Sequence, residues 1–221
     1  MGVQELLIWW ADPSAASLYG VEHLSADDAL RAPAIRSGKA QRDWQVSRAL
    51  LQHGRAARPG SGATSLSHSS GHALLATAPP GWKVGVDLEA TRPRNVDGLA
   101  QWVCSRAERD LLASLPEEAR LLRFYQLWTL KEAFIKAAGL DFPADMASVG
   151  LNPISTGLAL RPPAGRWSAC SYRAGAGWMA SVVWQAPDAS ARGPMEPAWH
   201  GAAGCALPEV ELAGQWRTDS A

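Results

Sequence analysis

The chain has 221 residues, with 21 basic and 21 acidic side chains, and its formal net charge is zero. A neutral chain has no global field that draws it onto nucleic acid or an anionic membrane, so any anion-binding site must be local. Hydrophobic residues make up 47% of the chain, which excludes disorder throughout and provides for a sizeable core in one domain or two small halves.

The sequence also argues against a membrane-inserted or exported protein. No apolar run approaches the roughly 18 to 20 residues of a membrane-spanning helix, and the start, MGVQELLIWWADP, lacks the basic residues and long apolar stretch of a signal peptide. We therefore expect a cytoplasmic protein with neither a membrane nor a nucleic-acid partner.

The first half of the chain is predicted to contain a strand, two helices and a further strand, in that order. Apolar runs indicate strands, and a Ser25–Asp28 capping pattern and helical apolar spacing indicate two helices, the second closed by Gly54. The predicted elements are a strand at 6–10, helices at 25–36 and 43–53, and a strand at 73–78; a strand at 84–89 then opens the second half.

The second half repeats this order. Ser105 with Glu108 predicts a capped helix, and a longer helix runs from Pro116 to about Ala138, where Gly139 ends it. Strands are predicted at 168–172 and 178–184. The order indicates two similar α+β halves, residues 1–81 and 82–186, followed by an Ala-, Pro- and Gly-rich flexible tail at 187–221.

Asp87 and Glu89 form the first candidate site, in the strand VGVDLE. Alternate residues of a strand share a face, so both carboxylates project from one side, about 7 Å apart, opposite Val84, Val86 and Leu88. The spacing suits one hard divalent cation. A solvated strand end explains the same pattern.

Glu132 is the second candidate, on the helix LLRFYQLWTLKEAFIKAAG. It interrupts an apolar stripe that includes Trp128 and Ile135, and burying an unpaired carboxylate costs several kcal/mol. A metal shared with Asp87 and Glu89 would supply the partner, and Lys136, one turn further, would neutralise phosphate. The alternative is a solvated Glu132–Lys136 pair at the helix edge.

The third candidate is the segment SLSHSSG at 65–71, predicted as a small-residue turn before a strand. Its backbone N–H groups and hydroxyls suit phosphate oxygens, with His68 as a cation or donor. An ordinary loop explains it equally well. The sequence contains neither a GxSxG nucleophile elbow nor a phosphate-binding glycine loop.

Taken in order, SLSHSSGHALLATA, VGVDLE, WVCSRAE and LWTLKEAFIK resemble the 4'-phosphopantetheinyl transferases of the larger, surfactin-synthetase-activating (Sfp-like) type. The resemblance spans residues 65–136, with a weaker extension back to about residue 25. It implies a pseudo-twofold pair of α+β halves with the active site at their junction. It also implies Mg²⁺-dependent transfer of phosphopantetheine from coenzyme A to a serine of an acyl or peptidyl carrier protein, which is the holo-[acyl-carrier-protein] synthase reaction.

The resemblance assigns a role to each candidate residue. Asp87, Glu89 and Glu132 would bind Mg²⁺, Glu132 would also accept the serine proton, and Lys136 would stabilise the pyrophosphate. His68, backed by Ser67, would contact the 3'-phosphate of coenzyme A, as would Arg31. The carrier is expected to present an acidic surface to Arg-rich stretches such as 106–123, and the enzyme is expected to be a monomer.

One segment departs from the family pattern. Larger members carry a Gly-Lys-Pro segment before the Ser-His-Ser motif, whereas this chain has a shortened stretch at 57–62 in which Arg58-Pro59 is the possible substitute. Two alternatives therefore stay open: a catalytically silent module that binds coenzyme A or a carrier, and an unrelated α+β phosphate-binding enzyme.

Overall fold

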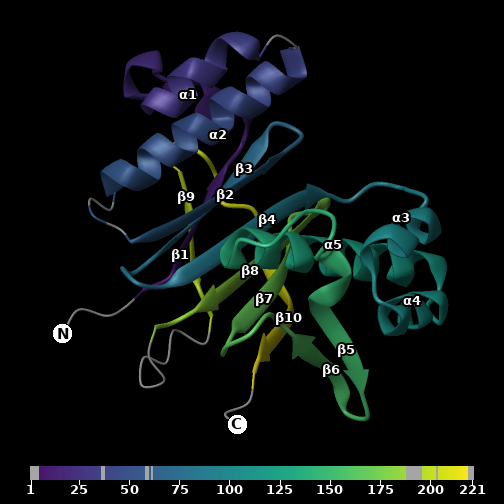
Figure 1. The fold of residues 1–221 in the computed structure, drawn as a ribbon. Helices are drawn as coiled ribbons and strands as arrows, with labels where there is room; N and C mark the ends of the chain where they lie inside the picture. Colours follow the sequence, from purple (N-terminus) through teal and green to yellow (C-terminus); the bar gives the residue numbers. More distant parts are fainter. Residues whose placement is uncertain are drawn as a thin grey trace.

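The computed structural model describes residues 5–35, 38–57, 60, 62–187, 196–202 and 204–218, and it confirms the α+β class (Figure 1). The helices are α1 (Ala26–Arg31), α2 (Gly38–Ala57), α3 (Val96–Val103), α4 (Arg106–Ala113) and α5 (Glu117–Ala138). The strands are β1 (Leu7–Ala11), β2 (Ala63–Ser69), β3 (His72–Ala78), β4 (Lys83–Ala90), β5 (Gly150–Ile154), β6 (Gly157–Arg161), β7 (Ser168–Ala174), β8 (Trp178–Gln185), β9 (Ala198–Gly201) and β10 (Val210–Arg217).

These strands form two four-stranded sheets and a separate hairpin. The first sheet has the order β2-β3-β1-β9, the second has the order β10-β7-β8-β4, and β5 pairs with β6. All pairs are antiparallel except β1 with β9. β2 and β4 are therefore edge strands of different sheets.

The elements form four layers in the order helix, sheet, sheet and helix, with a hydrophobic core between each layer and the next. The middle core joins the inner faces of the two sheets, with Ile8 and Leu74 meeting Val86 and Val182. Helix α2 covers the outer face of the first sheet, and α5 covers the outer face of the second. The division of the chain into halves at residues 1–81 and 82–186 stays a prediction.

Local signals set the ends of two helices where they were predicted. Ser105 and Glu108 form a complete capping box at the start of α4. Gly139 ends α5 in the left-handed conformation with φ of 65°. Gly54 does not end α2, which continues to Ala57; a Cβ at Gly54 would lie 2.3 Å from Leu75 Cδ2, so the glycine serves close packing instead.

Residues 65–69 lie in a strand, so the predicted turn at 65–71 is corrected. The chain reverses only at Ser70 and Gly71, whose φ angles are 48° and 82°. The strand forms a main-chain ladder with β3, and its alternate serines find partners on β4, a tertiary effect that composition does not reveal.

The prediction of a flexible tail at 187–221 is wrong for the segments that form β9 and β10. β9 extends the first sheet beside β1, and β10 extends the second beside β7. Both strands pair with backbone N–H and C=O groups at the edge of a sheet. Such pairing is made by main-chain hydrogen bonds, so the Ala-, Pro- and Gly-rich composition of the segment does not reveal it. Trp199 of β9 also packs against Tyr172, with ring centroids 5.0 Å apart.

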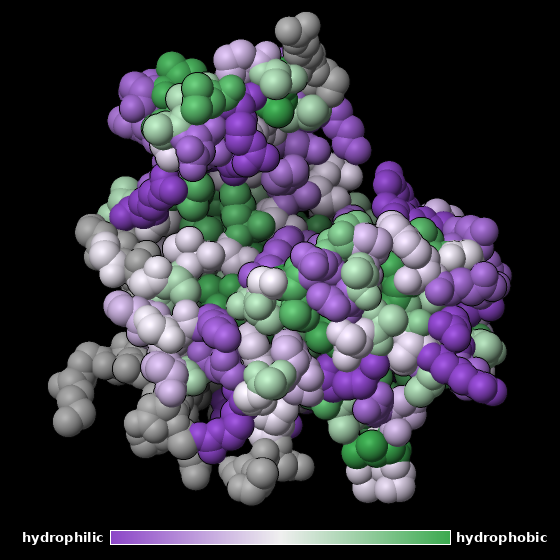
Figure 2. Space-filling view, viewed as in Figure 1, coloured by the Kyte–Doolittle hydropathy of each residue, from purple (hydrophilic) through white to green (hydrophobic). Residues whose placement is uncertain are grey.

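The face of the molecule seen in Figure 2 carries polar and apolar residues side by side. Among the described helices, none combines the length and the apolar character needed to cross a membrane.

Candidate active site

Asp87 lies at the centre of the candidate site, on the edge strand β4. Its side chain is buried, and Oδ1 accepts hydrogen bonds from Ser67 Oγ and Lys136 Nζ, both at 2.7 Å. Oδ2 is also buried, and it has no hydrogen-bond partner among the described residues. One oxygen of this carboxylate is therefore fully engaged, while the other is available to a ligand.

A glycine on β4 brings α5 close to this carboxylate. A Cβ on Gly85 would lie 1.9 Å from the carbonyl oxygen of Ala133, so any larger residue would force the helix away from the strand. The close approach lets Lys136 reach both Asp87 and the carbonyl oxygen of Val86, the latter at 3.1 Å. In the described structure Lys136 thus forms its ion pair with Asp87, and not with Glu132 as the helix-edge alternative required.

The carboxylates of Glu89 and Glu132 share the electrostatic environment of Asp87. Burial, followed by the negative charge of Asp87, raises the pKa of Glu132 to about 7. The same two causes raise the pKa of Glu89, against the hydrogen bond that Ser69 Oγ donates to it at 3.2 Å. The negative charge of Asp87 thus acts on both glutamates, against the attraction of Lys136 for Glu132 and of Arg94 and Arg92 for Glu89.

The donor chemistry of these residues fits a hard divalent cation, although the side chains do not form a closed ligand set. In the part of the chain that the structure describes, no group of three or more His, Cys, Asp or Glu side chains stands ready to hold a metal ion. Three carboxylates that repel one another, one with a buried unpartnered oxygen, nevertheless supply the oxygen ligands that Mg²⁺ prefers.

Ser67 and His68 lie on opposite faces of β2, so the expected backing of His68 by Ser67 is wrong. The buried Ser67 hydroxyl donates to Asp87 and accepts the Leu88 N–H at 3.3 Å, which leaves it facing β4. Side-chain alternation places His68 on the other face, with Leu66, which packs against the α2 core. Ser67 therefore acts on the carboxylate site, not beside His68.

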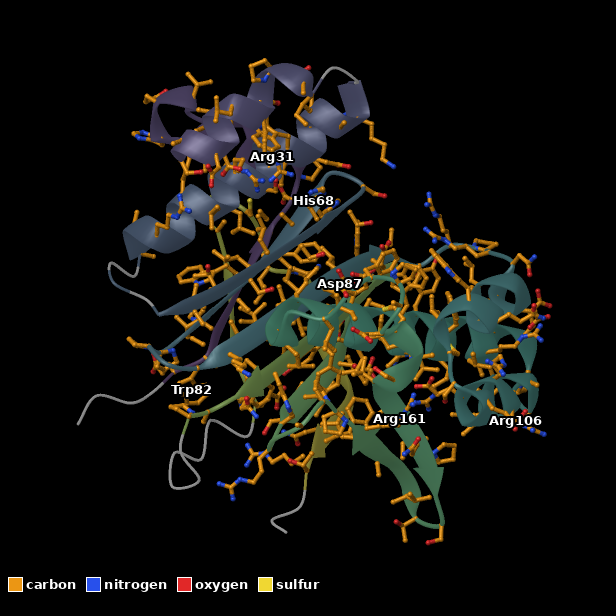
Figure 3. The ribbon with its side chains drawn as sticks, in the orientation of Figure 1. Arg31, His68, Trp82, Asp87, Arg106 and Arg161 are labelled. Carbon is orange, nitrogen blue, oxygen red and sulfur yellow. The ribbon has the colours of Figure 1, made fainter. Side chains whose placement is uncertain are left out.

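His68 lies within the electrostatic reach of both α2 and the carboxylate site. Partial desolvation lowers its pKa; Asp43 opposes this and Arg48 adds to it, while Lys136 and Asp87 contribute less. Figure 3 shows Arg31, His68 and Asp87 in succession from the helical layer toward the junction of the two sheets.

Arg31 ends α1 as an exposed residue. Helix α1 is fixed to α2 by the Asp28–Arg48 ion pair, whose Oδ2–Nε distance is 3.0 Å. The short helix stops at Arg31, before the predicted residue 36, because Pro33 follows and the chain tightens into a 3-10 turn over Ala32–Ala34. Arg58, Pro59 and Ser61 of the shortened segment lie outside the described residues.

Lys131 is adjacent to Glu132 in the sequence and yet points away from the carboxylate site. It is fully buried, and its Nζ lies 2.8 Å from Glu108 Oε2 and 2.8 Å from the carbonyl oxygen of Met146. Glu108 Oε1 in turn accepts the Leu151 N–H at 3.1 Å. Lys131 therefore ties α5 to α4 and to the β5–β6 hairpin, which sequence analysis did not predict.

The decisive comparison is with known protein families. Residues 83–182 match the 4'-phosphopantetheinyl transferase superfamily. This match confirms the resemblance inferred from the motifs, and its range includes Asp87, Glu89, Glu132 and Lys136.

Individual 4'-phosphopantetheinyl transferases show the same similarity over part of their length. The chain is 36% identical over 104 residues to 4'-phosphopantetheinyl transferase HetI of Nostoc sp., covering 47% of this chain and 43% of the relative. It is 37% identical over 71 residues to 4'-phosphopantetheinyl transferase Sfp of Bacillus subtilis, covering 31% of each chain. The aligned segment thus spans less than half the length of the curated transferases that it matches.

Among solved structures, the chain is similar to a holo-(acyl-carrier-protein) synthase from Bacillus anthracis in complex with CoA (3',5'-ADP). The TM-score is 0.40 and the identity 15%, covering 46% of this chain and 93% of that one.

Proposed function

We propose that this protein is a Mg²⁺-dependent 4'-phosphopantetheinyl transferase. It moves the phosphopantetheine arm of coenzyme A onto a serine of an acyl or peptidyl carrier protein and releases adenosine 3',5'-bisphosphate. The observation that carries the proposal is the close approach of α5 to β4 at Gly85, which gathers Glu132 and Lys136 around Asp87 within the segment that matches the superfamily.

In this proposal the chain binds the pyrophosphate of coenzyme A at the junction of the two halves. Asp87, Glu89 and Glu132 hold Mg²⁺, which supplies charge neutralisation for the pyrophosphate oxygens. Lys136 adds a second positive charge beside Asp87. His68 and Arg31 contact the 3'-phosphate, where Arg31 offers its guanidinium as a bidentate donor.

The transfer step needs a proton acceptor as well as bound charge. The carrier serine oxygen forms a bond to the β-phosphorus, the bond from that phosphorus to the bridging oxygen breaks, and the bisphosphate leaves with that oxygen. Glu132 accepts the serine proton, directly or through water.

The carrier is proposed to meet the Arg-rich stretch 106–123 with an acidic surface. Within this stretch, Arg109 donates to the carbonyl oxygen of Cys104 at 2.7 Å, and Arg123 is half-buried. Arg106 is the most solvent-exposed of them, with 90% of its side chain exposed, and Figure 3 places it at the outer end of α4. We further propose that the enzyme is a cytoplasmic monomer.

The test is a transfer assay with purified protein, coenzyme A, Mg²⁺ and several apo carrier proteins, followed by mass spectrometry of the carrier. We expect one phosphopantetheine group per carrier, and no transfer in EDTA. If the protein binds coenzyme A but modifies none of the carriers, the silent binding module is the correct alternative. If it binds neither coenzyme A nor a carrier, the site belongs to an unrelated phosphate-binding protein.

A further inference from the structure

The side chains of alternate serines on β2 hydrogen-bond to main-chain N–H groups along the edge of β4 that faces away from β8. Ser65 Oγ accepts the Val86 N–H at 3.0 Å, and Ser67 Oγ accepts the Leu88 N–H at 3.3 Å. These two N–H groups belong to an edge strand whose ladder partner, β8, lies on the other side. The hydroxyls thus satisfy buried main-chain donors where the two sheets meet.

Two of these serines also contact the candidate metal ligands. Ser67 Oγ donates to Asp87 Oδ1 at 2.7 Å, between two buried residues. Ser69 Oγ donates to Glu89 Oε2 at 3.2 Å, in a less buried position. Alternate side chains of a strand lie on one face. Asp87 and Glu89 on β4 therefore both face β2, where Ser67 and Ser69 lie on the face toward β4.

We propose that Ser67 and, more weakly, Ser69 are positioning residues for the metal ligands Asp87 and Glu89. The proposal rests on the proposed function, since it concerns the same site. Ser67 and Lys136 together occupy Asp87 Oδ1, so they fix the rotation of the carboxylate and leave the buried, unpartnered Oδ2 as the oxygen for the cation. Partners of this kind typically change metal affinity by about 10- to 100-fold when they are removed.

Ser65 provides a matched control, because it has the main-chain role of Ser67 without a carboxylate partner among the described residues. Both side chains are buried, at 9% and 6% exposed, and both accept one N–H of β4. Ser65→Ala and Ser67→Ala therefore each remove one hydrogen bond to a main-chain N–H of β4. Only Ser67→Ala also removes a hydrogen bond to Asp87.

The experiment measures Mn²⁺ binding to each purified full-length variant by electron paramagnetic resonance, without coenzyme A, and thermal unfolding in EDTA. We expect similar losses of unfolding temperature for the two variants, about 10-fold weaker Mn²⁺ binding for Ser67→Ala, and binding within about twofold of the unmodified protein for Ser65→Ala. Ser69→Ala is expected to weaken binding less than Ser67→Ala. Ser67→Cys, which keeps the volume and weakens the donor, is the second variant if Ser67→Ala does not fold.

Two different failures are distinguishable. Equal Mn²⁺ affinities for the Ser65 and Ser67 variants, with transfer by the unmodified protein intact, would overturn the positioning role alone. If the unmodified protein does not bind Mn²⁺, the metal role in the proposed function is wrong and the positioning role is wrong with it.

Discussion

Lys136 and Asp87 join the last turns of α5 to the edge strand β4, with Nζ 2.7 Å from Oδ1. The lysine stands 49 residues from the aspartate in the chain, and the pair exists because Gly85 lets the helix backbone approach the strand. The same pair places a positive charge where a pyrophosphate and a cation are proposed to bind, so its removal should affect ligand binding as well as local packing.

We expect Lys136→Gln to reduce transfer by at least 100-fold, because it removes a charge that acts on the developing oxyanion. The loss is expected in kcat as well as in the KM for coenzyme A, measured by the carrier mass assay. Lys83→Gln, at the exposed start of the same strand, is the control and should leave transfer within twofold. Equal rates for the two variants would show that Lys136 has no part in the reaction.

Glu132→Gln is expected to abolish transfer and leave the fold intact. The amide keeps the shape of the side chain but can neither accept the serine proton nor contribute charge to the metal site. The measurement is carrier modification together with the circular dichroism spectrum. Normal transfer by a folded Glu132→Gln protein would place the site elsewhere.

Glu132 also predicts a pH dependence of stability in metal-free buffer. Burial and the charge of Asp87 raise its pKa to about 7 in the folded protein, so between the ordinary glutamate pKa and about 7 the folded state holds a proton that the unfolded state has lost. The contribution of this carboxyl to stability is therefore present at low pH and is lost as the pH rises toward about 7.

We accordingly expect the unfolding temperature of the unmodified protein in EDTA to fall relative to that of Glu132→Gln between about pH 5 and pH 8. Differential scanning calorimetry at several pH values measures the difference. Parallel curves for the two proteins would contradict a raised pKa at Glu132.

Lys131 is predicted to be essential for stability and dispensable for phosphate contact. Lys131→Met leaves Glu108 as a buried charge without its closest cation, 2.8 Å away, and breaking such a pair costs about 3 to 5 kcal/mol. Chemical denaturation should show this loss, and the double variant Lys131→Met with Glu108→Leu should recover part of it. A Lys131→Met protein of normal stability with a raised KM for coenzyme A would assign the lysine to the ligand instead.

Truncation after Pro187 is expected to prevent stable folding, because it removes β9 and β10 from the two sheets. The edges of β1 and β7 would then carry unpaired backbone groups, and Tyr172 would lose the ring of Trp199. Soluble yield and thermal unfolding measure the effect, with a chain ending at Thr218 as the length control. A truncated protein that unfolds cooperatively at the normal temperature would show that these strands contribute little.

The sequence by itself determined the features that depend on near neighbours in the chain. The capping box at Ser105, the glycine that ends α5 and the two carboxylates on one face of β4 follow from local backbone preferences and side-chain periods, so they could be predicted. The ordered motifs likewise predicted the similarity to phosphopantetheinyl transferases.

Only the tertiary structure decided which distant group each polar side chain contacts. Ser67 faces Asp87 instead of joining His68, Lys131 pairs with Glu108, and the tail segments complete both sheets. These bonds join residues from 20 to nearly 200 positions apart, and they form because buried polar groups and sheet edges must find partners wherever the fold brings them. Local sequence specifies the need for a partner, and packing selects the partner.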